Sequence, residues 1–377
     1  MHPEFPQEGI IHFNHAAVGP WPRRTEQAVC EFARENVLHG SREYGSWMEV
    51  VEATRELGRQ LIGAPSTEDI AFVKNTSEAL SMVAFGLPWK AGENIVIPRG
   101  EFPSNRVVWH AAAERFGLEV REVDLDAAPE RALLDACDGR TRLLATSAVR
   151  YDSGLRVDIQ ALGVELRRRG ILFCVDAIQH LGALPFDAPG CEADFVMADA
   201  HKWLLAPEGI GLFYVNPEIR DSLVLQEYGW HMLAHAGDFS HPGLKPAESA
   251  RRFEPGSPNM LGVHALRASL SLLLETGLDV IDHDIRGHWL HLADALEAMG
   301  CSILTPHDRR AGILTFRPAV EDLDMFYARL QGAGVLCALR GGGIRLSPHF
   351  YLREEQIEEG LNRIQKALET PATAAAR

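Results

Sequence analysis

One lysine of this chain stands where an amine can do chemistry. Lys202 lies in "ADAHKWLLAPEGIGLFYV", between a histidine and a tryptophan and directly after an apolar run. Only five of the 37 basic residues are lysines, so arginine supplies almost all of the positive charge. A desolvated lysine can lose its proton and become a nucleophilic amine, which arginine does not do. Lys202 is therefore the candidate for a Schiff base, although an amphipathic lysine lying along an apolar patch has the same sequence pattern.

The second candidate is an acid at the end of a buried run. Asp176 closes the apolar stretch "ILFCV", and a buried aspartate needs a partner. It can cap the helix expected from "AIQHLG". Alternatively, it can keep a pyridine nitrogen protonated, as an aspartate does in enzymes that use pyridoxal 5′-phosphate (PLP). Because Lys202 and Asp176 suit the same cofactor, we predict a PLP site.

A PLP site also needs a phosphate cradle, and "VKNTSEAL" offers one. Thr76 and Ser77 stand directly ahead of a helical pattern, and the free amides of a helix N-terminus together with hydroxyl groups bind anions. The same letters are an ordinary helix cap. Both interpretations stay open at this point.

Two further side chains fit a flat cofactor and its substrate. Phe102 follows the apolar run "ENIVIP", where its ring can stack on a heteroaromatic ring or fill the core. Arg345 lies in the short apolar stretch "GGGIRLSP". A guanidinium there needs an anion, which is either a substrate carboxylate or a structural acid.

The elements that must position these residues follow from periodicity. Between about residues 68 and 215, helical patterns alternate with short apolar runs, which is typical of a mostly parallel sheet with both faces covered. Ligands of such sheets bind at the carboxyl ends of the strands. The predicted strands are "ENIVIP", "LEVREVDL", "TRLLATSAV", "ILFCVDA", "ADFVMADA" and "GIGLFYV".

The rest of the chain predicts a second, smaller lobe. Residues 216–258 are rich in Gly, Pro and His and predict a long, functional connection. One long helical pattern then runs from 259 to 299, followed by short strands and a closing helix. We expect an N-terminal segment (1–20), a large PLP-binding domain (21–258) and a small α+β C-terminal domain (259–377) to which the N-terminal segment contributes. The tail "ETPATAAAR" is expected to fray.

Composition limits the partners and the location. The formal charge of −15 over 377 residues disfavours nucleic acid and anionic membranes. No basic segment followed by an apolar one opens the chain, and no long apolar run occurs, which predicts a soluble cytoplasmic protein. The six cysteines are scattered, as reduced thiols are.

Together these motifs resemble the class V aminotransferase family, PLP enzymes of fold type I that include cysteine desulfurases, kynureninase and isopenicillin N epimerase. "VDAIQHLG" followed by "ADAHKW" is the most specific part, and "NTSEA", "RRFEPGSPN" and "IRLSPHFY" occur in the expected order over nearly the whole chain. The resemblance implies an α/β fold with a large and a small domain. It also implies that Lys202 forms the internal aldimine with PLP and that Asp176 is the pyridinium partner.

The resemblance assigns the other roles by position. Gln179 is similar to the residue that contacts the ring O3′, and Phe102 to the stacking residue. Arg345 resembles the arginine that takes the substrate α-carboxylate. Thr76, Ser77 and His201 resemble phosphate ligands or their neighbours, while Ser257 is similar to a serine that reaches the phosphate bound by the other subunit, which implies a homodimer with the PLP site at the subunit interface.

Several residues depart from the family pattern. Phe102 stands where desulfurases stack a histidine, and the loop that carries their nucleophilic cysteine is here a short glycine turn. Cys337 lies in an apolar run, which favours a buried thiol. Asp199 replaces a common phosphate-binding serine and is expected to point away, toward His201. No metal site is predicted, because His231, His235 and His241 have no adjacent acid and are expected at the rim of the active site.

These departures decide the expected reaction. Without an accessible thiol to receive sulfur, we expect chemistry at Cα of a small α-amino acid, by transamination or epimerisation. The alternative is a C–S lyase that performs β-elimination like a cysteine desulfurase. A second alternative is a fold relative without catalysis, which the retention of Lys202, Asp176, Gln179 and Arg345 argues against.

Overall fold

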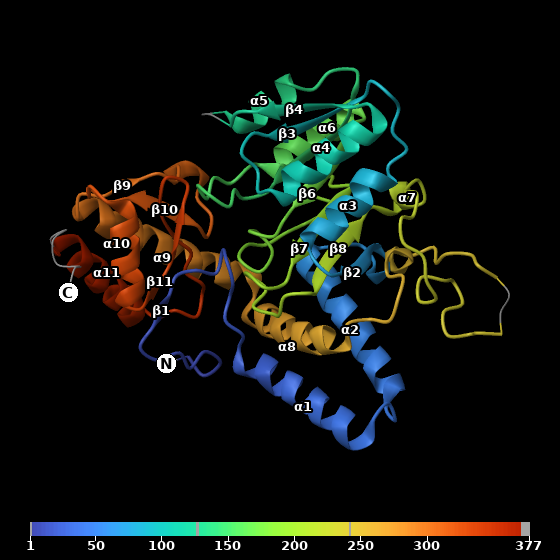
Figure 1. Cartoon of the computed structure of the whole chain (residues 1–377), viewed down its shortest axis with the longest axis horizontal. Coiled ribbons are helices and arrows are strands. Elements are labelled where there is room, and N and C mark those ends of the chain that lie inside the picture. The colour runs from blue at the N-terminus through green and yellow to red at the C-terminus, as the bar shows by residue number, and fades with distance from the viewer. Residues whose placement is uncertain (1, 126–127, 241–242, 371–377) are drawn as a thin grey trace.

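The computed structural model describes residues 2–125, 128–240 and 243–370. The chain forms a larger and a smaller lobe, and the helices α8 and α9 run from one to the other (Figure 1). These two helices are Met260–Thr276 and Leu278–Ala298. The larger lobe holds the central sheet and the smaller lobe holds the C-terminal strands.

The central sheet has seven strands in the order β2-β8-β7-β6-β5-β3-β4. β8 pairs antiparallel with both of its neighbours, whereas the other pairs are parallel. The predicted mostly parallel sheet is confirmed, and the analysis missed only β2 among its strands. The bounds are β2 Ile70–Val73, β3 Asn94–Pro98, β4 Glu119–Val123, β5 Thr141–Ser147, β6 Leu172–Asp176, β7 Phe195–Asp199 and β8 Gly211–Val215.

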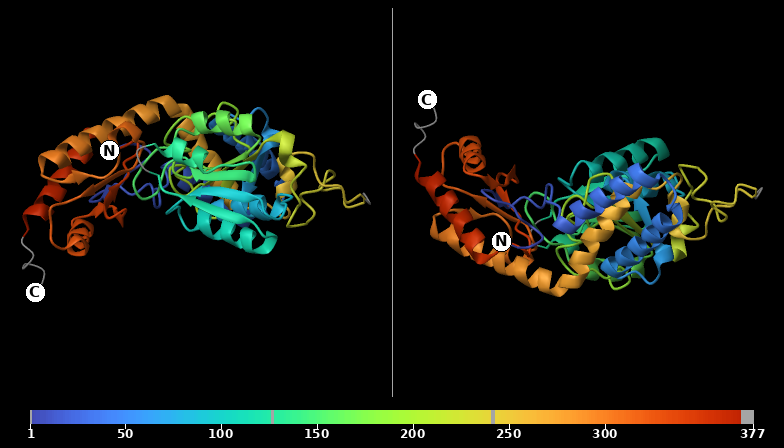
Figure 2. Two further views of the ribbon diagram at one scale, coloured as in Figure 1. Left: turned by 90° about the horizontal axis from the view of Figure 1, so that it is seen from above. Right: turned by 90° about the horizontal axis from the view of Figure 1, so that it is seen from below.

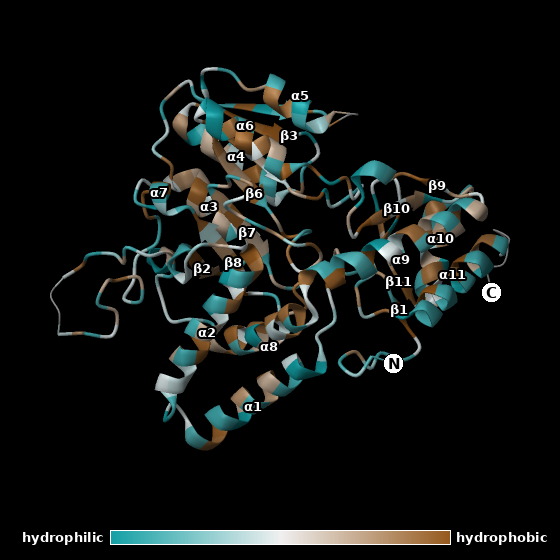
Figure 3. Ribbon diagram, turned by 180° about the vertical axis from the view of Figure 1, so that it is seen from behind, coloured by the Kyte–Doolittle hydropathy of each residue, from teal (hydrophilic) through white to brown (hydrophobic). Residues whose placement is uncertain are grey.

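Helices cover both faces of this sheet. Alternate residues of a strand enter different apolar clusters. Ile95 and Ile97 of β3 belong to the cluster that includes residues of α3 and α4, whereas Val96 belongs to the cluster that includes residues of α2, α6 and α8. Apolar residues accordingly gather in the central strands, whereas outer helices carry both kinds of residue (Figure 3). The helices of this lobe are α1 Arg23–His39, α2 Tyr44–Ile62, α3 Thr76–Gly86, α4 Ser104–Phe116, α5 Pro129–Asp135 and α6 Ile159–Arg169.

The long helical pattern of residues 259–299 forms two helices. Gly277 has a φ of 89° and ends α8, and α9 begins at the next residue. The expectation of one long helix was wrong because this glycine adopts a backbone conformation that breaks the helix. α8 packs along α1 and α2 of the larger lobe.

The smaller lobe combines a four-stranded antiparallel sheet, in the order β12-β13-β10-β9, with helices. The N-terminal strand β1, Ile11–His12, pairs in parallel with β11, Val335–Leu336. The domain boundaries after residues 20 and 258 stay a prediction. The other elements are β9 Ser302–Ile303, β10 Leu314–Arg317, β12 Ala338–Arg340, β13 Gly343–Leu346, α10 Leu323–Gly332 and α11 Glu354–Glu369.

In its described part, the connection over residues 216–258 contains α7, Pro217–Arg220, a 3₁₀ turn, Ala250–Phe253, and an isolated bridge between Leu233 and Pro246. Its described part projects from the body in the views from above and below (Figure 2). Residues 371–377 of the tail that was expected to fray lie outside the described residues.

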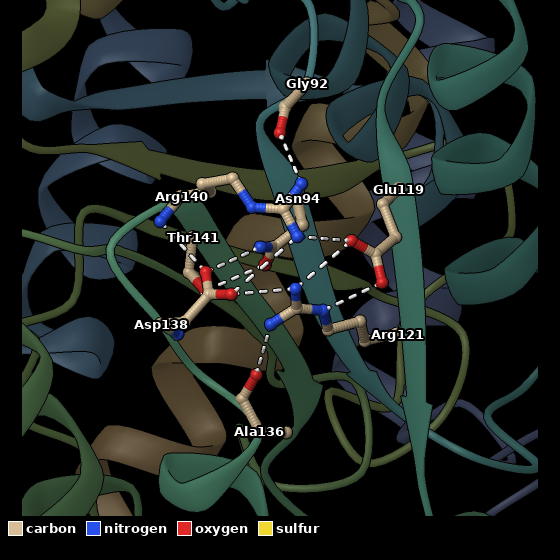
Figure 4. A network of polar contacts seen from close by, with 8 residues as sticks. All are labelled: Gly92, Asn94, Glu119, Arg121, Ala136, Asp138, Arg140 and Thr141. Atoms are coloured by element: carbon tan, nitrogen blue, oxygen red, sulfur yellow. Dashed lines mark hydrogen bonds and ion pairs between the residues drawn. The ribbon is translucent and has the colours of Figure 1, made fainter.

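A network of charges joins the amino ends of three strands (Figure 4). Asp138 accepts hydrogen bonds from Asn94 Nδ2 at 2.9 Å and Arg121 Nη2 at 2.8 Å, and Arg121 also donates to Glu119. β3 begins at Asn94, β4 at Glu119 and β5 at Thr141. The network therefore stabilises the amino ends of these strands. The candidate site residues lie at the opposite edge of the sheet, at the carboxyl ends of the strands.

Candidate active site

A cavity of ≈ 270 Å³ opens at the carboxyl ends of β5, β6 and β7. It lies where a mostly parallel sheet is expected to bind its ligand. Most of the side chains that the sequence predicted for the site line this cavity, whereas Ser257, His231 and His235 do not. The residues brought together are Thr76, Ser77, Phe102, Asp176, Gln179, His201, Lys202 and Arg345.

Lys202 is buried three residues after the end of β7, with 8% of its surface exposed. Burial lowers the pKa of its amine, and the charge of Arg345 lowers it further, while Asp176 acts in the opposite direction. Its Nζ lies 5.5 Å from the centre of the Phe102 ring. The amine of Lys202 therefore has a lowered pKa, loses its proton more readily than a lysine in water, and lies beside an aromatic ring.

Asp176 ends β6 and has two hydrogen-bond donors. Its Oδ1 accepts from the backbone N–H of Ile178 at 3.0 Å, and its Oδ2 accepts from Asn105 Nδ2 at 3.1 Å. The first bond closes a turn. The helix that the capping interpretation expected from "AIQHLG" was wrong, because these residues form turns and an isolated bridge between β6 and β7. Burial raises the pKa of this carboxyl group, and the nearby Glu101 raises it further. Asp176 is thus a buried acid for which a cationic partner in the cavity would be favourable.

The N-terminus of α3 faces the same cavity. Asn75 caps the helix by accepting from the backbone N–H of Glu78 at 2.9 Å. Thr76 Oγ1 accepts from the backbone N–H of Asp199 at 3.1 Å, and the hydroxyl groups of Ser77 and Ser104 lie 2.8 Å apart. The cap is therefore Asn75, and the hydroxyls of Thr76 and Ser77 stand beside free amides that suit an anion.

Gln179 and His201 each contact neighbouring groups of the chain. Gln179 donates to the carbonyl oxygen of Ala16 at 3.0 Å and accepts from Trp203 Nε1 at 2.8 Å. His201 Nδ1 lies 3.1 Å from Asp199 Oδ1. Asp199 lies beside His201, as expected, but it lines the cavity, so the expectation that it points away was wrong.

Arg345 is buried in β13 without a carboxylate partner among the described residues. Its Nη1 donates to the carbonyl oxygen of Tyr151 at 2.6 Å, its Nη2 lies 3.5 Å from Asn14 Oδ1, and its Nε has no hydrogen-bond partner. Burial, and then the charge of Arg340, lower the pKa of Arg345 to about 10. The structural salt bridge considered from sequence is absent from this part of the chain, so the guanidinium keeps capacity for an anionic ligand.

These side chains fit PLP. The cavity offers an amine, a buried acid opposite in charge to a pyridinium, a helix N-terminus with hydroxyls for a phosphate, and an aromatic face. The unpaired Nε of Arg345 fits the carboxylate of an amino acid. Among the lining groups, Asp199 is the one that disfavours a phosphate, and its Oδ1 lies 3.1 Å from His201 Nδ1.

Comparison with known proteins agrees with this chemistry. The family model described as aminotransferase class V matches residues 11–358. The chain belongs to this family. A probable cysteine desulfurase of Pyrococcus abyssi is 27% identical over 96% of this chain and 95% of its own length. A cysteine desulfurase of Klebsiella pneumoniae is 32% identical over 81% of this chain and 77% of its own length. An uncharacterized aminotransferase of Bacillus subtilis, YcbU, is 30% identical over 85% of each chain.

Solved structures share the fold. The Escherichia coli cysteine desulfurase CsdA superposes with a TM-score of 0.86 at 24% identity, covering 97% of both chains. A complex of the cystine C–S lyase C-DES with its product, cysteine persulfide, gives 0.89 at 21% identity and covers 95% of this chain and 98% of the other. As a member of the class V aminotransferase family this protein is an enzyme, its fold is the predicted fold type I, and its cofactor is PLP. The names of its relatives favour C–S cleavage over the transamination or epimerisation expected first.

Ser257 lies in a different cavity of this class V enzyme. That cavity, of ≈ 260 Å³, is lined by the segment Glu254, Pro255, Gly256 and Ser257. Glu254 is buried and accepts from Arg55 Nη1 at 2.5 Å and from the backbone N–H of Phe72 at 2.9 Å, which anchors the segment. The role assigned to Ser257, toward the other subunit, stays a prediction.

Neither Cys337 nor the histidines of the connection reach the cavity. Cys337 is 2% exposed, and burial raises the pKa of its thiol to about 12. His231 is buried against Glu254, and His235 is exposed. Neither His231 nor His235 lines the cavity of its own chain, so neither lies at the rim where it was expected. His241 lies outside the described residues. Within the described ranges, no group of His, Cys, Asp or Glu side chains is arranged to hold a metal ion.

The structure adds residues that sequence reasoning missed. Ser147 and Tyr151 line the cavity after β5, and Arg340 lines it from β12. Ser147 ends β5, but the predicted strand "TRLLATSAV" continued to Val149, so the rule that found Asp176 did not point to Ser147. Arg340 resembled an ordinary surface arginine, and no local signal marked it. No helix in the described part of the chain combines the length and apolar character that a membrane crossing requires.

Proposed function

We propose that this enzyme is a PLP-dependent C–S lyase, which cleaves a sulfur-bearing α-amino acid and releases the sulfur in a small molecule. The observation that carries the proposal is the absence of a thiol from the cavity lining, as far as the chain is described. The relatives named as cysteine desulfurases support cleavage at sulfur. The burial of Cys337 supports release rather than transfer of sulfur to the protein.

Each cavity residue has a role in this proposal. Lys202 binds the cofactor covalently through its amine and, once freed by the substrate, carries the proton of Cα. Asp176 stabilises a positive charge on the pyridine nitrogen, and Phe102 contacts the ring. The bound cofactor supplies an electron sink for the bonds at Cα. Phosphate is held at the N-terminus of α3 by Thr76, Ser77 and the neighbouring His201, with Gln179 near the ring oxygen.

Arg345 fixes the substrate by its α-carboxylate and so selects the bond that is broken. In the net reaction, the Cβ–S bond breaks and its electron pair leaves with sulfur. The proton of Cα passes to Lys202, and water replaces the amino group. An amino acid R–S–CH₂–CH(NH₃⁺)–COO⁻ and water thus give R–SH, pyruvate and ammonium.

The assembly and location belong to the same proposal. We infer a homodimer in which Ser257 of each chain serves the phosphate in the other chain's site. The small amino-acid substrate binds in the same cavity, beside Arg345. Six free cysteines support a reducing compartment, the cytoplasm.

Transamination is the second candidate, because one relative that covers most of the chain is called an aminotransferase. Incubating the holoenzyme with L-cysteine, L-cystine and L-alanine in D₂O separates the candidates. A C–S lyase forms pyruvate and ammonium from the sulfur amino acids. Formation of alanine with a protein-bound persulfide would indicate a desulfurase instead. Amino transfer to a keto acid, or deuterium exchange at Cα without cleavage, would support the expectations that were formed first. Lys202→Ala is the inactive control.

A further inference from the structure

A second arginine faces the cavity beside Arg345. Arg340 is the last residue of β12, is exposed, and lines the cavity. Its Nη1 donates to the carbonyl oxygen of the adjacent Leu339 at 3.1 Å. None of the ion pairs formed among the described residues involves Arg340. Its charge is therefore available to a ligand in the cavity.

The turn after Arg340 fixes where this charge is presented. Gly341 and Gly342 have φ angles of 61° and 76° and connect β12 directly to β13. A Cβ atom on Gly341 would lie 2.6 Å from the carbonyl oxygen of Asp152, so the turn is packed closely against this residue. The hydroxyl of Thr315 donates to the same carbonyl oxygen at 2.7 Å. A short, packed turn holds Arg340 at the cavity with little freedom in its backbone.

The two carboxylates that line the cavity have neighbours other than Arg340. In the proposed function Asp176 faces the cofactor nitrogen and the phosphate binds at the N-terminus of α3, while Asp199 lies beside His201. The α-carboxylate of an amino acid neutralises Arg345. The proximity of the two arginines is unfavourable, as the effect of Arg340 on the pKa of Arg345 shows. A ligand with one negative charge would satisfy only one of them.

We propose that Arg340 binds a second anionic group at the far end of the substrate, beyond sulfur. The preferred substrates are then sulfur amino acids whose S-substituent carries a carboxylate or another anion. This inference rests on the proposed C–S lyase function. The Cβ–S bond lies between the two arginines in such a substrate, and the thiol that leaves keeps the anionic group: ⁻OOC–CH₂–S–CH₂–CH(NH₃⁺)–COO⁻ and water give ⁻OOC–CH₂–SH, pyruvate and ammonium.

A matched pair of compounds tests the proposal. S-carboxymethyl-L-cysteine carries a distal carboxylate, and S-carbamoylmethyl-L-cysteine has a neutral amide of nearly the same shape. Each is titrated into the holoenzyme while the absorption of the cofactor is followed, which gives a Kd even where turnover is slow. Pyruvate release then gives kcat/KM. The variants are Arg340→Gln, Arg340→Lys and, as a control that removes the same charge outside the cavity, Arg317→Gln.

We expect the wild type to prefer the carboxylate about ten-fold in both Kd and kcat/KM, as a charge-assisted hydrogen bond at a half-open site provides. Arg340→Gln reduces this ratio about ten-fold, Arg340→Lys reduces it less, and Arg317→Gln leaves it unchanged. Added salt lowers the preference of the wild type.

The results that would overturn this inference can be distinguished from those that would overturn the C–S lyase proposal. The inference is overturned if the wild type binds neither compound or does not discriminate between them. The same holds if the ratio is equal in the wild type and Arg340→Gln, or if Arg317→Gln lowers it equally. If the binding preference depends on Arg340 but no pyruvate forms, the anionic subsite stands and the C–S lyase proposal fails.

Discussion

Lys202 and Asp176 are buried at the same cavity, and burial shifts their pKa values in opposite directions. It lowers the pKa of the amine to about 8 and raises the pKa of the carboxyl group. The amine must be unprotonated to attack an aldehyde carbon. The environment of Lys202 therefore brings its nucleophilic form within reach at neutral pH.

We predict that the apoenzyme takes up PLP faster as pH rises. Below about pH 8 the unprotonated fraction of Lys202 grows roughly ten-fold per pH unit, and above it the rate levels off. The charge of Asp176 raises this pKa and that of Arg345 lowers it, so Asp176→Asn shifts the midpoint to lower pH and Arg345→Gln shifts it to higher pH. Stopped-flow absorbance measures the rate. A midpoint near pH 10, unmoved in both variants, would contradict the burial of Lys202.

At the scale of residues, sequence reasoning succeeded where a polar group lies in an apolar run and would be buried at a high energetic cost without a partner. Lys202, Asp176 and Arg345 each interrupt an apolar run, and burying such groups requires a partner. Tyr151 and Arg340 escaped because each lies in or beside a turn, where polar residues are expected in any protein. Their place in the site depends on the packing of β13 against the loop after β5, which no local pattern encodes.

At the scale of elements, the turn between β12 and β13 separates two arginines that line the cavity, Arg340 and Arg345. Gly341 and Gly342 both have positive φ, but only Gly341 is crowded, by the carbonyl oxygen of Asp152. Substitution of Gly342 therefore measures the free-energy cost of backbone strain alone, whereas substitution of Gly341 adds the cost of displacing the turn.

We predict that Gly342→Ala lowers the free energy of unfolding by about 1 kcal/mol, the cost of φ alone. Gly341→Ala adds a clash and is expected to cost about 2–3 kcal/mol. Because Gly341→Ala displaces the turn, it also raises KM for the carboxylate substrate, whereas Gly342→Ala does not. Thermal unfolding and steady-state kinetics measure both effects. Equal losses of stability with unchanged KM in both variants would show that the packing of the turn does not position the site.

Most strands and helices of the sheet followed from their apolar periods, and the exceptions have physical causes. The break at Gly277 looked like a tolerated glycine inside a helix, because the pattern continues on both sides. β2 has four buried residues, too few to show a period. β8 pairs antiparallel with β7. The connection between the two strands holds no helical crossover, which a parallel pair requires, but the sequence pattern did not show which direction β8 takes.

At the scale of the whole molecule, exposed apolar side chains mark faces that a second subunit can cover. Val37 and Leu38 on α1 are 83% and 65% exposed, and Tyr228 and Phe239 of the connection are 73% and 83% exposed. Apolar groups of this size favour association. The segment with Ser257 also lies outside the cavity of its own chain, as a role in the other subunit requires.

A hybrid dimer tests this arrangement. We predict that Lys202→Ala and Ser257→Asp are each inactive as homodimers, the second because a carboxylate repels the phosphate. Co-expression with two different affinity tags yields hybrids in which one site has both an intact Lys202 and an intact Ser257 from the other chain. These hybrids should recover about half of the wild-type activity. Inactive hybrids would place Ser257 in the site of its own chain, and a monomeric mass with full activity would exclude the shared site.

The measurement that tests the central claim most directly is the position of the covalent bond to the cofactor. The chain offers five lysines, of which Lys202 alone lines the cavity within the described residues. Reduction of the holoenzyme with borohydride, digestion and mass spectrometry should find the pyridoxyl group on Lys202. Lys202→Ala should lose both the adduct and the absorption band of the bound cofactor, and Lys245→Ala should keep them. An adduct on another lysine, or an unchanged spectrum in Lys202→Ala, would contradict the account.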